Sequence, residues 1–327
     1  MSNLKKLRKK RFKEYVIGVD GGGTKTMAAL ADLDGLRPAH HPPKGPLILK
    51  IGKSGSSHPR NLGLEMAIEN LTFAVKKVLP RNGKILSTFI GLPAVAEEYK
   101  FKIKEIEKEL KKHKEISKIF KGKLKIGSDQ EVALRTGTDG DGIMLNAGTG
   151  CVAHGWHNKK EAHASGWGWL GDEGGAFFVG QRVFQAILKD LDGRGKKTLL
   201  TKLVFKKFKI KREENFLDLI YQKNPTEIIP SLSVICDEAS KKGDKIAKEI
   251  IVEAAKEAAL TAKAIISRLS FQKNKFPLVL VGGMFKSEIF LRTVKKEIRK
   301  FVPKFDFILL KEKPIIGAVK LAIGNLK

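Results

Sequence analysis

The chain has 327 residues, a length that suggests about two domains. Apolar residues make up 42% and charged residues 30%, as is typical of a globular protein, and no apolar run approaches the ~18 residues of a membrane span. The two cysteines, Cys151 and Cys236, are too few for a disulfide framework or a four-cysteine metal site, so a reducing, cytoplasmic location is expected. The basic start of the chain lacks the apolar segment of a secretory signal.

The net charge is strongly positive. Lys and Arg total 63 and Asp and Glu total 35, which gives +28. Most of these cations are lysines spread along the chain, a pattern typical of a solvated surface. Weak, salt-sensitive binding of polyanions is expected as a by-product. Residues 1–13 combine basic charge with few apolar side chains and are predicted to form a disordered arm.

Strands and helices alternate along the chain, which predicts an α/β fold with a mixed sheet. Glycine turns that follow strands near Asp20 and Asn146 suggest a duplicated architecture. The predicted elements are strands at 15–19 and 26–31, a loop at 37–46, a helix at 61–78, a strand at 85–92, a long amphipathic helix at 97–120, strands at 124–127 and 142–146, a glycine-dense loop at 165–175, a helix at 176–188, a mostly helical stretch at 198–269, a strand at 276–281, and helices at 287–301 and 314–323.

The sharpest local motif is the first glycine turn, which places an acid, three glycines and a lysine between two strands. Glycines let backbone N–H groups point at an anion and tolerate the positive φ that such a turn needs. The acid could hold a metal ion through water. The motif is neither a P-loop nor G-x-G-x-x-G, and a plain hairpin turn is the alternative. Its residues are Asp20, Gly21, Gly22, Gly23, Thr24, Lys25 and Thr26.

Two further glycine turns follow strands later in the chain. Residues 148–150 form a second candidate phosphate cradle, and the stretch to Ala153 formally matches the G-x-G-x-x-A dinucleotide fingerprint. That fingerprint requires a helix after the turn, and residues 154–158 do not favour one, so a dinucleotide-binding oxidoreductase is disfavoured. A third turn at 282–283 is uninformative when taken alone.

Three acids stand beside glycine turns, namely Asp129, Asp172 and Glu173. A carboxylate at a strand end can act as the general base for a hydroxyl, although a lone Asp at a turn more often caps it. The tryptophans near these loops suit a sugar ring as well as a protein core. The histidines show no metal-binding spacing, and no G-x-S-x-G nucleophile elbow is present.

The three glycine turns, each after a strand and in this order, resemble the phosphate-1, phosphate-2 and adenosine motifs of the sugar kinase/actin/Hsp70 ATPase superfamily. More narrowly, the chain resembles the BadF/BadG/BcrA/BcrD-type ATPase family and, inside it, the N-acetylglucosamine kinase branch. The resemblance is carried by IGVDGGGTKT at 17–26, SD at 128–129, AGTG at 147–150, GWGWLGDEG at 166–174, VGGMF at 281–285 and PIIGA at 314–318.

The resemblance implies two ribonuclease H-like (actin-like ATPase) domains, each a mixed five-stranded sheet flanked by helices, with a cleft between them. The N-terminal domain would span 14–128 and be joined by a C-terminal helix at 314–327. The C-terminal domain would span 129–313.

The resemblance also implies ATP and Mg²⁺ as cofactors and an amino sugar as substrate. Asp129 would be the general base, and Asp20 would hold Mg²⁺, if need be through water. The ATP phosphates would contact Gly21, Gly22, Gly23, Thr24, Lys25, Thr26, Gly148, Thr149 and Gly150, and adenosine would contact Gly282, Gly283 and Met284. The sugar would contact His58, Asp129, Thr149, Gly150, Gly166 and Asp172.

One position departs from the family pattern. The family has Ser-Asn-Pro after the first domain's loop, and its Asn contacts the sugar, whereas residues 56–59 here are Ser-Ser-His-Pro. Imidazole cannot reproduce the paired donor and acceptor of an amide. His58 therefore leaves the identity of the sugar open.

These features predict ATP-dependent phosphorylation of an amino sugar, such as N-acetylglucosamine or glucosamine, by in-line transfer to a sugar hydroxyl. The alternative is a BadF-type ATPase that acts as a nucleotide-driven switch or activator of a partner protein. The expected partner is a small-molecule sugar, with a homodimer left open and no membrane association.

Overall fold

The computed structural model describes residues 13–33, 46–93, 95, 100–221, 224–271, 275–302 and 304–326. These residues form two compact units, and we call unit 1 the described parts of Met1–Asp139 and Lys311–Lys327, and unit 2 those of Gly140–Leu310. The arm predicted at 1–13 and the loop predicted at 37–46 lie outside the described residues, apart from one residue of each. No helix in the described part of the chain is long and apolar enough to cross a membrane.

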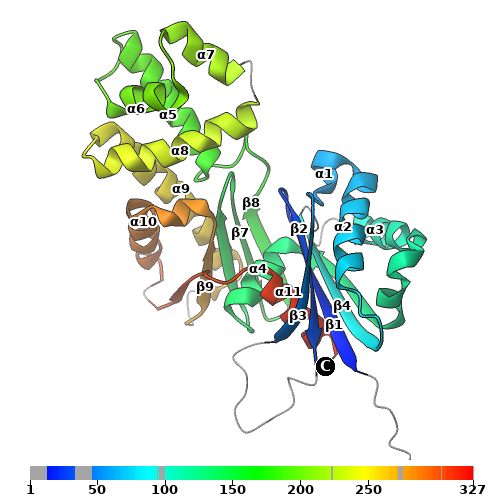
Figure 1. Cartoon of the computed structure of the whole chain (residues 1–327). Coiled ribbons are helices and arrows are strands. Elements are labelled where there is room, and N and C mark those ends of the chain that lie inside the picture. The colour runs from blue at the N-terminus through cyan, green and yellow to red at the C-terminus, as the bar shows by residue number, and fades with distance from the viewer. Residues whose placement is uncertain are drawn as a thin grey trace, which may run out of the picture. The chain divides into compact units, whose positions relative to one another are not determined.

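Each unit is built on a mixed five-stranded sheet, and the two sheets share one plan (Figure 1). In each, three antiparallel strands are extended by two parallel ones. The orders are β3-β2-β1-β4-β5 and β10-β9-β6-β7-β8. The strands are β1 (Glu14–Gly21), β2 (Thr26–Asp32), β3 (Leu47–Ser54), β4 (Lys84–Leu92), β5 (Lys123–Ser128), β6 (Gly142–Ala147), β7 (Cys151–His157), β8 (Lys160–Ser165), β9 (Pro277–Val281) and β10 (Asp306–Leu309). The predicted α/β class and the duplication are therefore confirmed.

The helices of unit 1 cover both faces of its sheet. They are α1 (Pro59–Leu62), α2 (Leu64–Val78), α3 (Lys100–Lys112), the 3₁₀ helix η3 (Lys114–Lys121), α4 (Asp129–Gly137) and α11 (Ile315–Gly324). Because side chains alternate along a strand, β1 contributes side chains to both faces of the sheet. Ile17 and Val19 pack with the core that includes α2, and Val16 packs with the core that includes α11.

The prediction of one continuous helix over 97–120 was wrong. Helix α3 ends at Lys112, His113 is extended, and a 3₁₀ helix follows. Ile116 and Ile119 are both fully buried, and the three-residue period of a 3₁₀ helix aligns positions i and i+3 on one face. Burial of this pair therefore favours the tighter helix.

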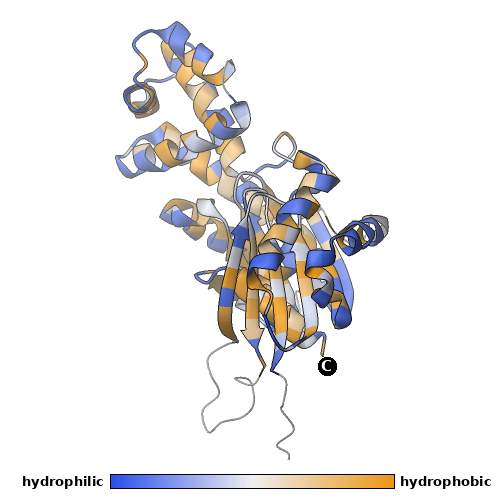
Figure 2. Ribbon diagram, turned by 45° about the vertical axis from the view of Figure 1, so that its right-hand side comes forward, coloured by the Kyte–Doolittle hydropathy of each residue, from blue (hydrophilic) through white to orange (hydrophobic). Residues whose placement is uncertain are grey.

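Unit 2 has a larger helical layer around its sheet. Its helices are α5 (Ala176–Leu191), α6 (Leu199–Phe208), α7 (Glu213–Tyr221), α8 (Pro225–Lys241), α9 (Lys245–Arg268), the 3₁₀ helix η5 (Gly283–Lys286) and α10 (Glu288–Arg299). Helix α9 packs on β6, β7 and β8 through a run of buried alanines. Small side chains on this face let a long helix lie close to the sheet, and Figure 2 shows the strands mainly in apolar colours.

Helix α4 falls in unit 1, although the sequence placed the domain boundary before it, at 128–129. In the structure the boundary between the compact units lies at Asp139/Gly140. The reason is packing, because α4 lies against α11, and Val132 shares a buried cluster with Ala318.

The last helix, α11, packs directly against the backbones of β1 and α4 in unit 1. A Cβ atom added at Gly18 of β1 would lie 2.4 Å from the amide nitrogen of Val319, and one at Gly317 would lie 2.0 Å from the carbonyl oxygen of Val132. Only glycine fits at both positions. The same helix therefore fixes β1, which leads to Asp20, and α4, which begins with Asp129.

Gly18→Ala is expected to destabilise the protein by about 2 kcal/mol or more, because the new methyl group must displace the backbone of α11. Gly324→Ala is the matched control, since a Cβ at that end of the same helix meets nothing within 4 Å. Urea unfolding curves measure both. An unchanged midpoint for Gly18→Ala would contradict this account of α11.

Candidate active site

The first glycine turn joins β1 to β2 in unit 1, as predicted. The strands pair antiparallel up to Gly21 and Thr26, and the amide of Gly22 donates to the carbonyl of Lys25 at 3.0 Å. The expectation of positive φ was wrong, because none of the three glycines adopts it. Gly21 is required instead by close approach, since an added Cβ would lie 2.4 Å from Oγ of Ser57. Gly23, Thr24 and Lys25 are exposed at the tip.

A second loop, residues 55–58, is bonded to this turn. The amide of Ser57 and the hydroxyl of Ser56 both donate to the carbonyl of Gly22 at 3.2 Å. The buried hydroxyl of Thr26 donates to the carbonyl of Gly55 at 2.8 Å, so this side chain holds the two loops together. The turn and the loop therefore form one rigid edge.

His58 sits on that edge beside the turn. Its Cδ2 lies 3.8 Å from a Cβ built on Gly23, and its buried Nδ1 has no hydrogen-bond partner among the described residues. Burial lowers the pKa of His58, and the charge of Arg60 lowers it further. The imidazole is therefore neutral at neutral pH and can donate from one nitrogen and accept at the other.

Asp20 lies near the end of β1, and Asp129 directly follows β5, at the same edge of the first sheet. β1, β4 and β5 run parallel, with Asp20 opposite Gly91 and Leu92 opposite Ser128. Ser128 caps α4 by accepting from the amide of Glu131 at 3.0 Å, and Asp129 is the first residue of the helix. The carboxyl ends of parallel strands thus bring the two acids to one edge.

The two acids have strongly perturbed pKa values. Burial, followed by the negative charge of Asp20, raises the pKa of Asp129 to about 7, and Oδ1 of Asp129 is buried without a hydrogen-bond partner among the described residues. Burial raises the pKa of Asp20 to about 6, although Lys25 opposes the shift. A carboxyl group poised near neutral pH beside another acid is typical of a catalytic site.

The fit of this edge to Mg²⁺ depends on the number of ligands. The described residues contain no group of three or more His, Cys, Asp or Glu side chains that could hold a metal ion. Mg²⁺ in phosphoryl-transfer sites is typically held by one or two carboxylates together with substrate phosphates and water. A single carboxylate such as that of Asp20 is within this number of protein ligands.

The second glycine turn joins β6 to β7 in unit 2. The amide of Gly148 donates to the carbonyl of Gly150 at 3.0 Å. The start of α5 is tied to the turn, because the amides of Ala176 and Phe177 donate to the carbonyls of Gly148 and Thr149 at 2.8 and 2.9 Å. The side chain of Thr149 is exposed at the tip.

Asp172 connects the second turn to the tryptophan-containing loop. Its Oδ1 accepts from the hydroxyl of Ser165 at 3.1 Å and from the amides of Gly166 and Trp167 at 2.9 and 2.8 Å. Its Oδ2 faces Gly150, where an added Cβ would lie 2.4 Å away. Burial raises the pKa of Asp172, and these hydrogen bonds oppose the shift. The structure thus brings together Gly150, Gly166 and Asp172, which the sequence predicted as substrate contacts.

The third glycine turn lies against the second. Gly282 adopts φ of +109°, and an added Cβ would lie 2.3 Å from the carbonyl oxygen of Ala147. Gly282 and Gly283 are exposed, whereas the side chain of Met284 is buried in the core of unit 2. Met284 can therefore offer only its backbone to a ligand.

Cys151 and the tryptophans near the glycine turns were also noted from the sequence. Burial raises the pKa of the Cys151 thiol to about 12, which makes it a poor nucleophile. Trp156 stacks on His154 at 3.9 Å, and Trp169 packs on Phe177 at 4.7 Å. Trp167, by contrast, is 74% exposed.

Several solved structures share this fold. A crystal structure from Chromobacterium violaceum, provisionally assigned as an N-acetylglucosamine kinase, superposes with a TM-score of 0.65 at 20% identity and covers 94% of this chain and 98% of its own. A ROK family glucokinase from Streptomyces griseus, solved with glucose and AMPPNP, gives 0.53 at 16% identity and covers 95% and 99%. Both sheets therefore follow the actin-like ATPase plan.

Sequence relatives extend over nearly the whole chain. The N-acetylmuramic acid/N-acetylglucosamine kinase of Clostridium acetobutylicum is 31% identical over 94% of this chain and 98% of its own length. The N-acetyl-D-glucosamine kinase of Dictyostelium discoideum is 28% identical over 96% and 99%. The family model described as BadF/BadG/BcrA/BcrD ATPase family matches residues 17–322, so the chain belongs to that family.

Proposed function

We propose that this protein transfers the terminal phosphoryl group of ATP to a hydroxyl of an amino sugar, N-acetylglucosamine or a close relative. Its place among the ATP-dependent sugar kinases rests on the two relatives named as kinases that it matches along nearly their full length. The observation that carries the mechanism is the carboxyl group of Asp129, which has an unpartnered buried oxygen and a pKa of about 7.

Asp129 is the general base of the proposed reaction. As the sugar hydroxyl attacks the terminal phosphorus, its proton passes to the Asp129 carboxylate, and the bond from that phosphorus to the bridging oxygen of ADP breaks. The proton later leaves to solvent. Base catalysis is most effective when the pKa of the base is near the working pH, and the burial of Asp129 supplies that match.

The glycine turns supply positioning and charge. Mg²⁺, when bound, neutralises developing negative charge on the phosphates, and Asp20 would hold it. In unit 1 the exposed tip of the first turn presents Thr24 and Lys25 to phosphate oxygens. In unit 2 the second turn would hold phosphate, and Gly282 and Gly283 leave an open surface for adenosine.

His58 and Asp172 are the proposed sugar contacts. The neutral imidazole of His58 has a buried nitrogen without a partner among the described residues, so a sugar hydroxyl or amide can satisfy it. Oδ1 of Asp172 is already engaged by three donors, so Oδ2 is the oxygen available to a ligand.

Asp129→Asn is expected to lower the sugar-dependent turnover by about 100-fold or more, the usual effect of removing a general base. The folded state should not suffer, because amide and protonated carboxyl are nearly isosteric. Steady-state kinetics and thermal unfolding measure the two effects. The control is Asp139→Asn, an exposed acid that pairs with Lys320 at 3.1 Å. Unimpaired turnover in Asp129→Asn would remove Asp129 from the mechanism.

The pH dependence follows from the raised pKa of Asp129. Since the base must be ionised, kcat/KM should fall about tenfold per pH unit below pH 7. Stability has the opposite sign, because a carboxyl with a raised pKa prefers to stay protonated in the folded state and is destabilising once ionised. Asp129→Asn should therefore unfold at a higher temperature than the wild type at pH 8, and the difference should vanish near pH 4. A wild-type acid limb centred near pH 4 would contradict this assignment.

His58→Ala is expected to raise the KM for the sugar about fivefold to tenfold, the value of one hydrogen bond, and to leave the KM for ATP unchanged. His113→Ala is the control, a histidine of the same unit that lies 3.6 Å from Glu115. Initial rates at varied sugar and varied ATP separate the two constants. Equal increases in both would show that His58 only supports the first glycine turn.

A further inference from the structure

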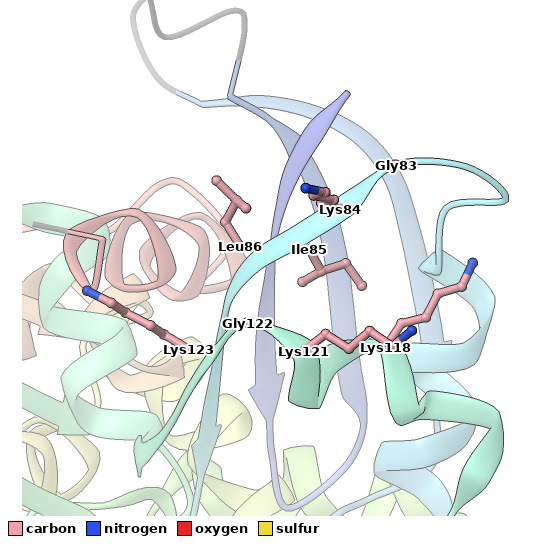
Figure 3. Close-up of a pocket in the computed structure, with 8 residues that line it drawn as sticks. All are labelled: Gly83, Lys84, Ile85, Leu86, Lys118, Lys121, Gly122 and Lys123. Carbon is pink, nitrogen blue, oxygen red and sulfur yellow. The ribbon is translucent and has the colours of Figure 1, made fainter. Parts of the chain in front are cut away.

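A second concave site lies in unit 1, at the amino ends of β4 and β5 (Figure 3). It encloses about 640 Å³, which is within the range of small-molecule sites. None of the candidate active-site residues lines it. The lining residues are Gly83, Lys84, Ile85, Leu86, Lys118, Lys121, Gly122 and Lys123, and we call this site the lysine groove.

The backbone itself builds the lysine groove. β4 begins at Lys84, but its pairing with β5 begins only where Ser87 meets Lys123, so three residues of β4 extend beyond β5. The register between β1 and β4 also skips Leu86, which marks a β-bulge. A Cβ added at Gly122 would lie 2.4 Å from the carbonyl oxygen of Ile85, so the backbones of these two lining residues are in close contact.

The side chains of the lysine groove carry one sign of charge. Four of its eight residues are lysines and none is acidic. In Figure 3 the lysines surround the start of β4, with Lys123 on one side and Lys118 and Lys121 on the other. Two residues further along β5 and outside the groove, Nζ of Lys125 lies 3.7 Å from Oε1 of Glu131.

Two of these ammonium groups are held in place by neutral acceptors. Nζ of Lys118 donates to the carbonyls of Pro80 and Arg81 at 2.9 and 3.1 Å, and Nζ of Lys123 donates to the carbonyl of Asn325 at 2.9 Å. A carbonyl positions an ammonium group without neutralising its charge, and each ammonium has three N–H donors. Both lysines therefore retain charge and donor capacity for a ligand.

The lysine groove is separate from the proposed catalytic edge. Both are built on β4 and β5, but at opposite ends of the strands. From Lys123 to Ser128 the chain advances five residues, or about 17 Å at the rise of a β-strand. A molecule in the groove would therefore not occupy the site beside Asp129.

We propose that the lysine groove binds a small phosphorylated metabolite that carries at least two negative charges. Lys118, Lys121 and Lys123 bring three positive charges to a groove whose lining contains no acid, which favours a multiply charged anion, and phosphate oxygens accept well from lysine. The half-buried side chain of Leu86 offers apolar surface to the remainder of such a molecule. This proposal does not depend on the kinase assignment.

Residue-resolved lysine footprinting tests the proposal. The full-length protein is labelled with an amine-reactive reagent at constant ionic strength and increasing pyrophosphate, and peptide mass spectrometry reads each lysine. We expect saturable protection of Lys118, Lys121 and Lys123, with no protection of Lys104 and Lys108, which line a shallow surface on α3 of the same unit. Equal protection of both sets would overturn the proposal in favour of diffuse attraction, and so would a complete absence of protection.

A pair of matched variants adds an independent measure. The double variant Lys118→Gln/Lys121→Gln should raise the pyrophosphate concentration that half-protects Lys123 by about tenfold or more. The double variant Lys104→Gln/Lys108→Gln should leave this concentration unchanged. Both pairs remove the same charge. An unchanged midpoint in the first pair would overturn the assignment, and citrate that protects as well as pyrophosphate would overturn the preference for phosphate. Because the readout is protection of named lysines, it is valid whether or not the protein phosphorylates a sugar.

Discussion

The contact of α11 with β1 and α4 is the constraint on which unit 1 depends. At Gly18 and at Gly317 the backbones approach so closely that no side chain fits. The last helix of the chain therefore closes the first sheet. β1 leads directly to Asp20 and α4 begins with Asp129, so this contact also fixes the elements that carry both acids. Backbone contacts hold elements more rigidly than side-chain contacts, and rigid support is what a catalytic constellation needs.

The acids at the edge of this sheet are unfavourable for folding. Burial raises the pKa of Asp129 and of Asp20, which means that their charged forms are poorly solvated. Buried polar atoms of Ser57 and His58 also lack hydrogen-bond partners among the described residues. Folded proteins satisfy nearly all such atoms, and a ligand at this edge would supply the missing partners of Asp129 and His58. The proposed amino-sugar kinase gives Asp129, Asp20 and His58 a partner or a task.

The sequence predicted those elements whose apolar spacing matches the periodicity of a strand or a helix. The strand–turn–strand at Asp20 was predictable because β-branched residues flank a run of glycines. Strand β7 was missed because His154 and Trp156 interrupt its apolar pattern, although His154 is fully buried in the fold and stacks on the half-buried Trp156. Helix α4 was missed because Ser128 and Asp129 were interpreted as a turn, although Ser128 followed three residues later by Glu131 is a helix N-cap pattern, and Ser128 does cap α4. The need for glycine at Gly21 comes from Ser57, which is distant in sequence.

The most direct test of the proposed function is ADP release with Mg-ATP in a coupled assay. The sugars are N-acetylglucosamine, N-acetylmuramic acid, glucosamine and glucose, with a blank that contains no sugar. An amino-sugar kinase should release ADP rapidly with at least one amino sugar, only slowly in the blank, and form one sugar phosphate for each ADP. Slow ADP release that is the same with every sugar and with the blank would contradict the account and favour a nucleotide-driven switch.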